Sequence, residues 1–157
     1  MEVLLEYDEI ETDNEKMASL NHSELQSHLA FLLRLAYRHQ YSILTELDFD
    51  FASGKIRPDV CIMERQQFDW TEDEITMKTP PITTIEILSP EQGLDGLMKR
   101  INQRHFPAGV QSVWVVLPAV QLVSIFLPDR QRINFSEGII TDPVTGIQLE
   151  LTAVFEG

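Results

Sequence analysis

Residues 82–90 read ITTIEILSP, and this short stretch decides the fold class. β-branched residues dominate it, which favours a strand, and Ser89-Pro90 ends it. Glu86 stands inside this otherwise apolar run, on the same face as Thr84 and Leu88 because side chains alternate along a strand. The stretch therefore predicts a short central strand that carries an acid.

The chain that follows predicts a crossover back to the same sheet. Apolar residues recur at helical spacing from Leu94 to His105, and Pro107 and Gly109 are expected to end that helix. Strands are expected over residues 113–117 and 121–127, with weaker strand signals at residues 132–135 and 147–151. A strand, helix, strand passage favours parallel pairing of its two strands, whereas the tight connections favour antiparallel edges.

A second acid-bearing strand lies upstream, over residues 56–63 (IRPDVCIM). It is expected to form a hairpin with the alternating run that begins at Ile43, through a turn at Ser53-Gly54. The period of two places Asp59 with Cys61 and Met63, on the face opposite Val60 and Ile62. An acid again occupies a strand that reads as buried.

An amphipathic helix is predicted to open the folded part of the chain. Asn21 is a good N-cap, Glu24 completes a capping box, and leucines follow at helical spacing until about His39. Residues 64–81 are polar and are expected to form a surface connection, with one helical turn between Glu72 and Met77. The expected fold class is α/β, with a central mixed sheet flanked by helices.

Length and composition indicate a single domain over residues 1–157 of 18.0 kDa, with an acidic segment at 1–19 and the folded part at 20–156. No apolar run approaches the roughly 20 residues of a membrane span, and the acidic start lacks the features of a signal peptide, so a cytoplasmic protein is expected. Cys61 is the only cysteine, which excludes an internal disulfide and a thiolate metal cluster. Its apolar setting is typical of core packing.

The charge balance argues against a polyanionic partner. The chain holds 12 Lys and Arg against 25 Asp and Glu, a net charge of −13, which repels DNA at long range. Seven of the acids fall within residues 1–16, whereas residues 97–132 are enriched in bases. DNA binding is therefore disfavoured overall, although a local basic patch is compatible with the sequence.

Asp59 and Glu86 are the candidate site residues, because two buried carboxylates on strands of one sheet are costly unless something neutralises them. A magnesium ion would remove that cost. It takes oxygen ligands, often one or two carboxylates with waters and phosphate oxygens, and it activates water for attack on a phosphodiester. The alternative is that each acid is paired with an arginine or is exposed at a strand end.

Several short landmarks together carry a resemblance to a known family. They are Asn21-His22, Arg57-Pro58-Asp59-Val60, Glu86-Ile87-Leu88-Ser89-Pro90, Ala108-Gly109-Val110 and Trp114-Val115-Val116-Leu117-Pro118. In this order, over roughly residues 20–156, the chain resembles the Uma family of "putative restriction endonucleases", which is abundant in cyanobacteria and built on the PD-(D/E)XK nuclease fold. The resemblance implies a restriction-endonuclease-like core, Asp59 and Glu86 as ligands of Mg²⁺ (or Mn²⁺), and hydrolysis of DNA.

The sequence also departs from the superfamily pattern. The lysine expected two residues after the glutamate is replaced by Leu88, and Lys99 on the following helix is the candidate substitute; its alternative is a surface pair with Asp95. His22 is a candidate to assist at the site, or else a solvated residue at a helix start. His105 stands where the family often has tyrosine, and its place in the apolar stripe is more typical of packing than of a ligand.

Two hypotheses follow. In the first, the protein is a Mg²⁺-dependent endonuclease in which Asp59 and Glu86 hold the ion, Lys99 supports the nucleophile and His22 assists. In the second, motivated by Leu88, the displaced lysine and the acidic surface, it is a catalytically degenerate nuclease fold that serves as a binding or assembly module. A homodimer is expected in either case, with residues 120–127 as an apolar candidate surface.

Overall fold

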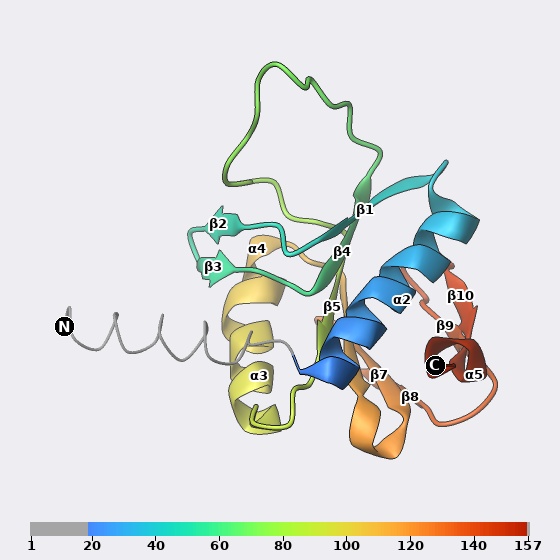
Figure 1. The fold of residues 1–157 in the computed structure, drawn as a ribbon. Helices are drawn as coiled ribbons and strands as arrows, with labels where there is room; N and C mark the ends of the chain where they lie inside the picture. Colours follow the sequence, from blue (N-terminus) through green and yellow to red (C-terminus); the bar gives the residue numbers. More distant parts are fainter. Residues whose placement is uncertain (1–18, 157) are drawn as a thin grey trace.

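The computed structural model describes residues 19–156, so nearly all of the acidic segment predicted at 1–19 lies outside the described residues. A six-stranded mixed sheet forms the centre of the fold (Figure 1). Its strands, in spatial order, are β1 (Tyr41–Thr45), β4 (Val60–Glu64), β5 (Thr83–Ile87), β6 (Ser112–Leu117), β7 (Leu122–Phe126) and β8 (Arg132–Phe135). The predicted central mixed sheet is therefore confirmed.

Helices cover both faces of this sheet. One face carries α3 (Leu94–Arg100), the π-helical turn η1 (Ile101–His105) and α4 (Phe106–Ala108). The other carries α2 (Leu20–Tyr37), against which a small C-terminal unit packs (Figure 1). That unit consists of β9 (Ile139–Thr141), β10 (Gln148–Glu150) and α5 (Leu151–Val154), so the predicted strand over residues 147–151 gives way to helix at Leu151.

The first helix begins two residues earlier than the capping pattern predicted. Ser19 is the N-cap, and its hydroxyl accepts a hydrogen bond from the His22 amide at 3.2 Å. The prediction of Asn21 as N-cap, with Glu24 in a capping box, was wrong: a serine two residues upstream makes the equivalent bond. The helix buries His22, Leu25, Leu29 and Leu33 along one stripe.

The strand, helix, strand passage forms as predicted. β5 and β6 pair in parallel, with Glu86 in register with Val115, and every other adjacent pair in the main sheet is antiparallel. The helical crossover continues through Pro107, which lies in the last turn, and ends at Gly109 with φ 111°. Proline is accommodated because the π-helical turn before it has already changed the pattern of backbone hydrogen bonds.

The predicted hairpin between the run from Ile43 and the strand of Asp59 is divided into two parts. Glu46 adopts φ 51° and interrupts the first strand, so β1 pairs with β4 in the main sheet. β2 (Phe49–Phe51) and β3 (Gly54–Ile56) form a separate small hairpin. Residues 65–82 form a long connection that contains no helix, so the helical turn predicted between Glu72 and Met77 is absent.

The two faces of the sheet contact different parts of the protein. Val60, Ile62 and Ile87 belong to the large core cluster beneath α2, whereas Cys61 and Met63 pack with the β2–β3 hairpin. This is the alternation predicted from the period of two. Asp59 is therefore carried at the start of β4 by a strand that is buried on both faces.

A buried carboxylate also joins the C-terminal unit to the sheet. Asp142 is fully buried, and its Oδ2 accepts hydrogen bonds of 2.7 Å from both Ser112 Oγ and Trp114 Nε1. Its Oδ1 accepts from the amides of Val144 at 2.7 Å and Thr145 at 3.4 Å. These donors account for the acid within the structure, so Asp142 is a structural residue.

Within residues 19–156, no helix has the length and apolar character needed to cross a bilayer.

Candidate active site

Asp59 and Glu86 lie where two antiparallel strands, β4 and β5, run side by side. Asp59 directly precedes β4, whose first residue, Val60, pairs with Ile85. The Asp59 carboxylate also accepts a hydrogen bond from the amide of Ile87, the residue after Glu86. Asp59 and Glu86 are both buried, with 2% and 5% of their surface exposed. Their role as a metal-binding pair stays a prediction.

Two further groups fix the Asp59 carboxylate. Its Oδ2 accepts a hydrogen bond of 2.7 Å from the Ile87 amide on β5. Its Oδ1 lies 3.1 Å from His22 Nε2, which the first turn of α2 supplies. His22 is itself buried, so the alternative of a solvated histidine at the helix start is wrong.

The donor atoms of the two acids decide which kind of ion they could hold. Asp59 and Glu86 together present hard oxygen donors of the kind that Mg²⁺ binds. Within residues 19–156 there is no group of three or more His, Cys, Asp or Glu side chains that could hold a metal. A cation here would thus need backbone, water or substrate oxygens as its other ligands.

Lys99 and Leu88 occupy different environments. Lys99 is exposed in the last turn of α3, and among the described residues it forms neither an ion pair nor a hydrogen bond. The alternative surface pair with Asp95 is consequently not formed. Leu88, two residues after Glu86, is partly buried and packs against the apolar cluster beneath α3. No cation is supplied at that position of the strand.

His105 lies on the same side of the sheet as Glu86. Its Nδ1 lies 2.9 Å from the hydroxyl of Thr84, two residues before Glu86 on β5, and its side chain is 2% exposed. It belongs to the π-helical turn, a local irregularity that occurs frequently at functional sites. The helical spacing of apolar residues predicted a helix here but not its π-helical turn, because such a turn shifts the apolar stripe without changing its composition. The packing role expected for His105 fits its burial.

The comparisons with known proteins place this geometry in context. A crystal structure of a "putative nuclease belonging to DUF820" from Anabaena variabilis ATCC 29413 has the same fold, with a TM-score of 0.78. The two sequences are 23% identical over an alignment that covers 90% of this chain and 83% of that one. This likeness confirms the restriction-endonuclease-like core expected from the sequence.

The comparison with curated proteins yields no match. The family profile of Uma2, described as "Putative restriction endonuclease", matches residues 3–153, which is nearly the whole chain. The resemblance seen in the short landmarks is therefore confirmed. The chain belongs to the Uma2 family.

Proposed function

We propose that the protein is a Mg²⁺-dependent endonuclease of the PD-(D/E)XK type, which hydrolyses phosphodiester bonds of DNA. The observation that carries this proposal is a pair of buried carboxylates: Asp59 directly precedes β4 and accepts a hydrogen bond from Ile87, the residue after Glu86 on β5. Family membership and the nuclease fold support the same reaction class.

Asp59 and Glu86 would hold the metal, Mg²⁺ in the first instance and Mn²⁺ as a substitute. When bound there, the ion supplies charge neutralisation at the phosphate and a coordinated water of lowered pKa. His22 and the Ile87 amide hold Asp59 in one orientation, so the ligand oxygens are fixed before substrate arrives. His22 thus acts in this proposal by positioning Asp59 from the first helix.

Lys99 is the proposed cation that supports the nucleophile. Its side chain is exposed and has no ion-pair partner within residues 19–156, so it keeps its rotamer freedom for reaching a bound phosphate. The net charge of −13 opposes DNA at long range. Screening limits that repulsion to about 8 Å at physiological ionic strength, so local contacts decide binding once the partners touch.

A homodimer remains part of the proposal, but its surface needs revision. Val123 and Ile125 of β7 are fully buried within a single chain, because β7 lies between β6 and β8. Of the predicted segment at 120–127, Val120 remains strongly exposed. On the edge strand β8, Ile133 is partly exposed and pairs with Ile125. A dimer surface on this side would therefore use the β8 edge.

The second candidate is a catalytically degenerate nuclease fold that serves as a binding or assembly module. It is favoured by Leu88 packing in an apolar cluster and by the protein's own partners for Asp59. His22 and the Ile87 amide offset part of the cost of burying this acid without a metal. This candidate predicts no cleavage with any divalent ion.

A plasmid-nicking assay separates the two candidates. Supercoiled DNA is incubated with Mg²⁺ or Mn²⁺ and either the wild type, Asp59→Asn, Glu86→Gln or Lys99→Ala. Asp48→Asn is the matched control, because Asp48 belongs to a half-exposed ion pair with Arg57 at 2.7 Å. The proposal predicts nicking by wild type and control, and its loss in Asp59→Asn and Glu86→Gln. Metal binding without nicking would favour the module, and nicking that survives both substitutions would contradict the assigned site.

A further inference from the structure

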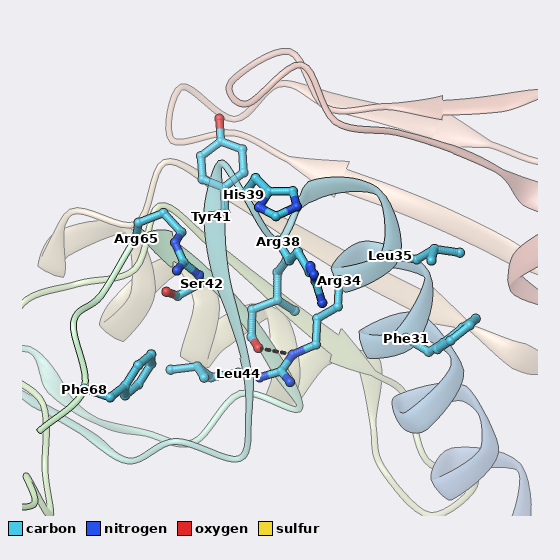
Figure 2. Close-up of a pocket in the computed structure, with 11 residues that line it drawn as sticks. Phe31, Arg34, Leu35, Arg38, His39, Tyr41, Ser42, Leu44, Arg65 and Phe68 are labelled. Carbon is cyan, nitrogen blue, oxygen red and sulfur yellow. Dashed lines mark hydrogen bonds between the residues drawn. The ribbon is translucent and has the colours of Figure 1, made fainter. Parts of the chain in front are cut away.

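A pocket of about 700 Å³ lies beside strand β1. It is bounded by the end of α2, by β1 and by the start of the 65–82 connection. Figure 2 shows the side chains that surround it. It is lined by Phe31, Arg34, Leu35, Arg38, His39, Tyr41, Ser42, Ile43, Leu44, Arg65 and Phe68. Neither Asp59 nor Glu86 is among these residues, so the pocket is separate from the candidate active site.

The charge of this pocket is opposite to that of the whole protein. Arg34, Arg38 and Arg65 line it, and no Asp or Glu does. Across residues 19–156, none of these three arginines forms an ion pair with an acid. Two acids adjoin lining residues without lining the pocket themselves: Glu64, in register with Tyr41, and Asp69, which follows Phe68. Screening over about 8 Å limits the effect of the more distant acids on a ligand in the pocket. The pocket is thus built for an anion in a protein that is otherwise strongly acidic.

Aromatic rings accompany the arginines. Phe68 and Phe31 are 49% and 58% exposed, and Figure 2 shows Arg34 reaching from α2 to the backbone of β1. Phe68 also stacks on Trp70, with ring centroids 5.7 Å apart, and Trp70 is itself highly exposed. Cationic grooves with exposed aromatic rings suit single-stranded nucleic acids, whose unpaired bases stack on the rings while phosphates meet the cations.

Strand β1 at the edge of the sheet is only partly available for pairing with a strand of another protein chain. β1 is the outermost strand of the sheet, and an open edge is a template for pairing with another chain. Here Arg34 Nε donates to the Ile43 carbonyl at 3.0 Å, which occupies an acceptor in the middle of that edge. Two such edges would also bring arginines of the same charge together. A second copy of this chain is therefore a poorer occupant than an anionic strand.

We propose that this pocket binds a segment of single-stranded nucleic acid, with phosphates at Arg38 and Arg65 and a base stacked on Phe68. The proposal goes beyond the cleavage reaction, because binding here needs neither metal nor Asp59. The geometry also connects the two sites: β1 runs from Tyr41 in the pocket to Thr45, which pairs with Val60 beside Asp59. At 3.3 Å per residue, that path is about 13 Å long.

The test is fluorescence anisotropy of a labelled single-stranded DNA oligonucleotide, in EDTA and at low salt, with the full chain. The variant is Arg38→Gln with Arg65→Gln, which removes two exposed charges without touching the core. The matched control is Arg130→Gln with Arg132→Gln, which removes the same charge at the turn before β8 and on β8, the opposite edge of the sheet. Urea midpoints verify that all proteins are equally folded.

The wild type is expected to bind, the pocket variant to bind at least tenfold more weakly, and the control to stay within twofold of wild type. The salt dependence of binding gives a second test of the same contacts. Each phosphate neutralised on a single strand contributes about −0.7 to the slope of log K against log salt. The pocket variant should therefore lose about 1.4 from the slope. Phe68→Ala should weaken binding to a normal oligonucleotide and leave binding to an abasic one unchanged.

Four results would overturn the proposal. They are absence of binding by the wild type, equal weakening in the control, binding of polyglutamate as tight as that of the oligonucleotide, and a change of oligomeric state caused by the pocket substitutions in sedimentation. The last two would assign the pocket to an acidic protein or to a second copy. Asp59→Asn should bind the oligonucleotide like wild type, so failure of the cleavage proposal and failure of this one are distinguishable.

Discussion

His22 Nε2 lies 3.1 Å from Asp59 Oδ1, and both side chains are almost completely buried. This contact ties the first turn of α2 to the start of β4, two elements separated by more than 20 residues of sequence. Because the Ile87 amide holds the other oxygen of Asp59, three elements converge on one carboxylate. The orientation of the Asp59 carboxylate therefore depends on a histidine and on a backbone amide.

Replacing His22 should cost stability. His22→Ala removes the partner of a buried carboxylate oxygen, and loss of one partner in a buried hydrogen bond costs about 1–3 kcal/mol. His39→Ala is the control, because His39 is exposed just beyond α2 and should change the free energy of unfolding by less than about 0.5 kcal/mol. Urea unfolding measures both. Equal stability of His22→Ala and wild type would show that the contact contributes nothing.

The thiol of Cys61 should be inert in the folded protein. Burial raises the pKa of Cys61 from 9.0 to about 12, with a weaker opposing effect of a hydrogen bond from the Leu44 backbone. At pH 8 the folded protein should therefore resist a thiol reagent, which should react once urea unfolds the chain. Rapid labelling under native conditions would contradict the burial of this thiol.

The same shift predicts a loss of stability at alkaline pH. The unfolded chain releases the thiol proton near pH 9 while the folded chain retains it until about pH 12, so the stability is complete below pH 9 and falls between these values. The slope approaches about 1.4 kcal/mol per pH unit. Cys61→Ala lacks this contribution, so its unfolding free energy should fall less steeply than that of the wild type over the same range.

Asp142 should be essential to the fold without affecting metal affinity. Asp142→Ala leaves the Trp114 indole N–H without its buried acceptor and removes one partner of Ser112, whose hydroxyl keeps Thr83 at 2.7 Å, and this should cost about 1–3 kcal/mol. Asp142→Asn keeps one acceptor oxygen and should be milder. Urea unfolding ranks the two, and metal titration of the folded Asp142→Asn protein should match the wild type. A larger loss for Asn than for Ala would contradict this account of the site.

Two glycines provide a matched pair of substitutions. Gly109 ends the crossover helix at φ 111°, and an added Cβ would lie 3.3 Å from Pro80 Cγ, so Gly109→Ala should destabilise by about 1–2 kcal/mol. Gly96 lies within α3 with nothing within 4 Å of an added Cβ, so Gly96→Ala should stabilise by about 0.5–1 kcal/mol. Thermal unfolding gives both signs. The same sign for both substitutions would contradict the assigned backbone conformations.

The sequence predicted those parts of the fold that depend on periodicity. The β-branched run around Glu86 and the alternation around Asp59 located two central strands, and their burial is confirmed. The sequence did not predict how Asp59 is placed against the strand of Glu86. Only the tertiary structure shows that its carboxylate accepts a hydrogen bond from the amide of Ile87, the residue after Glu86.

Other features depended on local backbone conformation or on distant contacts. The φ of 51° at Glu46 breaks a strand that composition alone would continue, and Ser19 caps the helix ahead of an equally suitable Asn21. The basic residues were sought between positions 97 and 132, whereas Arg34, Arg38 and Arg65 line the pocket. They come from a helix and from the chain after β4, so only the tertiary fold brings them together.

Calorimetric titration with Mg²⁺ and Mn²⁺ measures whether Asp59 and Glu86 hold a divalent ion. Wild type, Asp59→Asn, Glu86→Gln and the control Asp48→Asn are titrated under identical conditions. We expect saturable binding to wild type and control, and affinity at least tenfold weaker in both site variants. Absence of binding to the wild type, or binding that both site substitutions leave unchanged, would contradict this expectation.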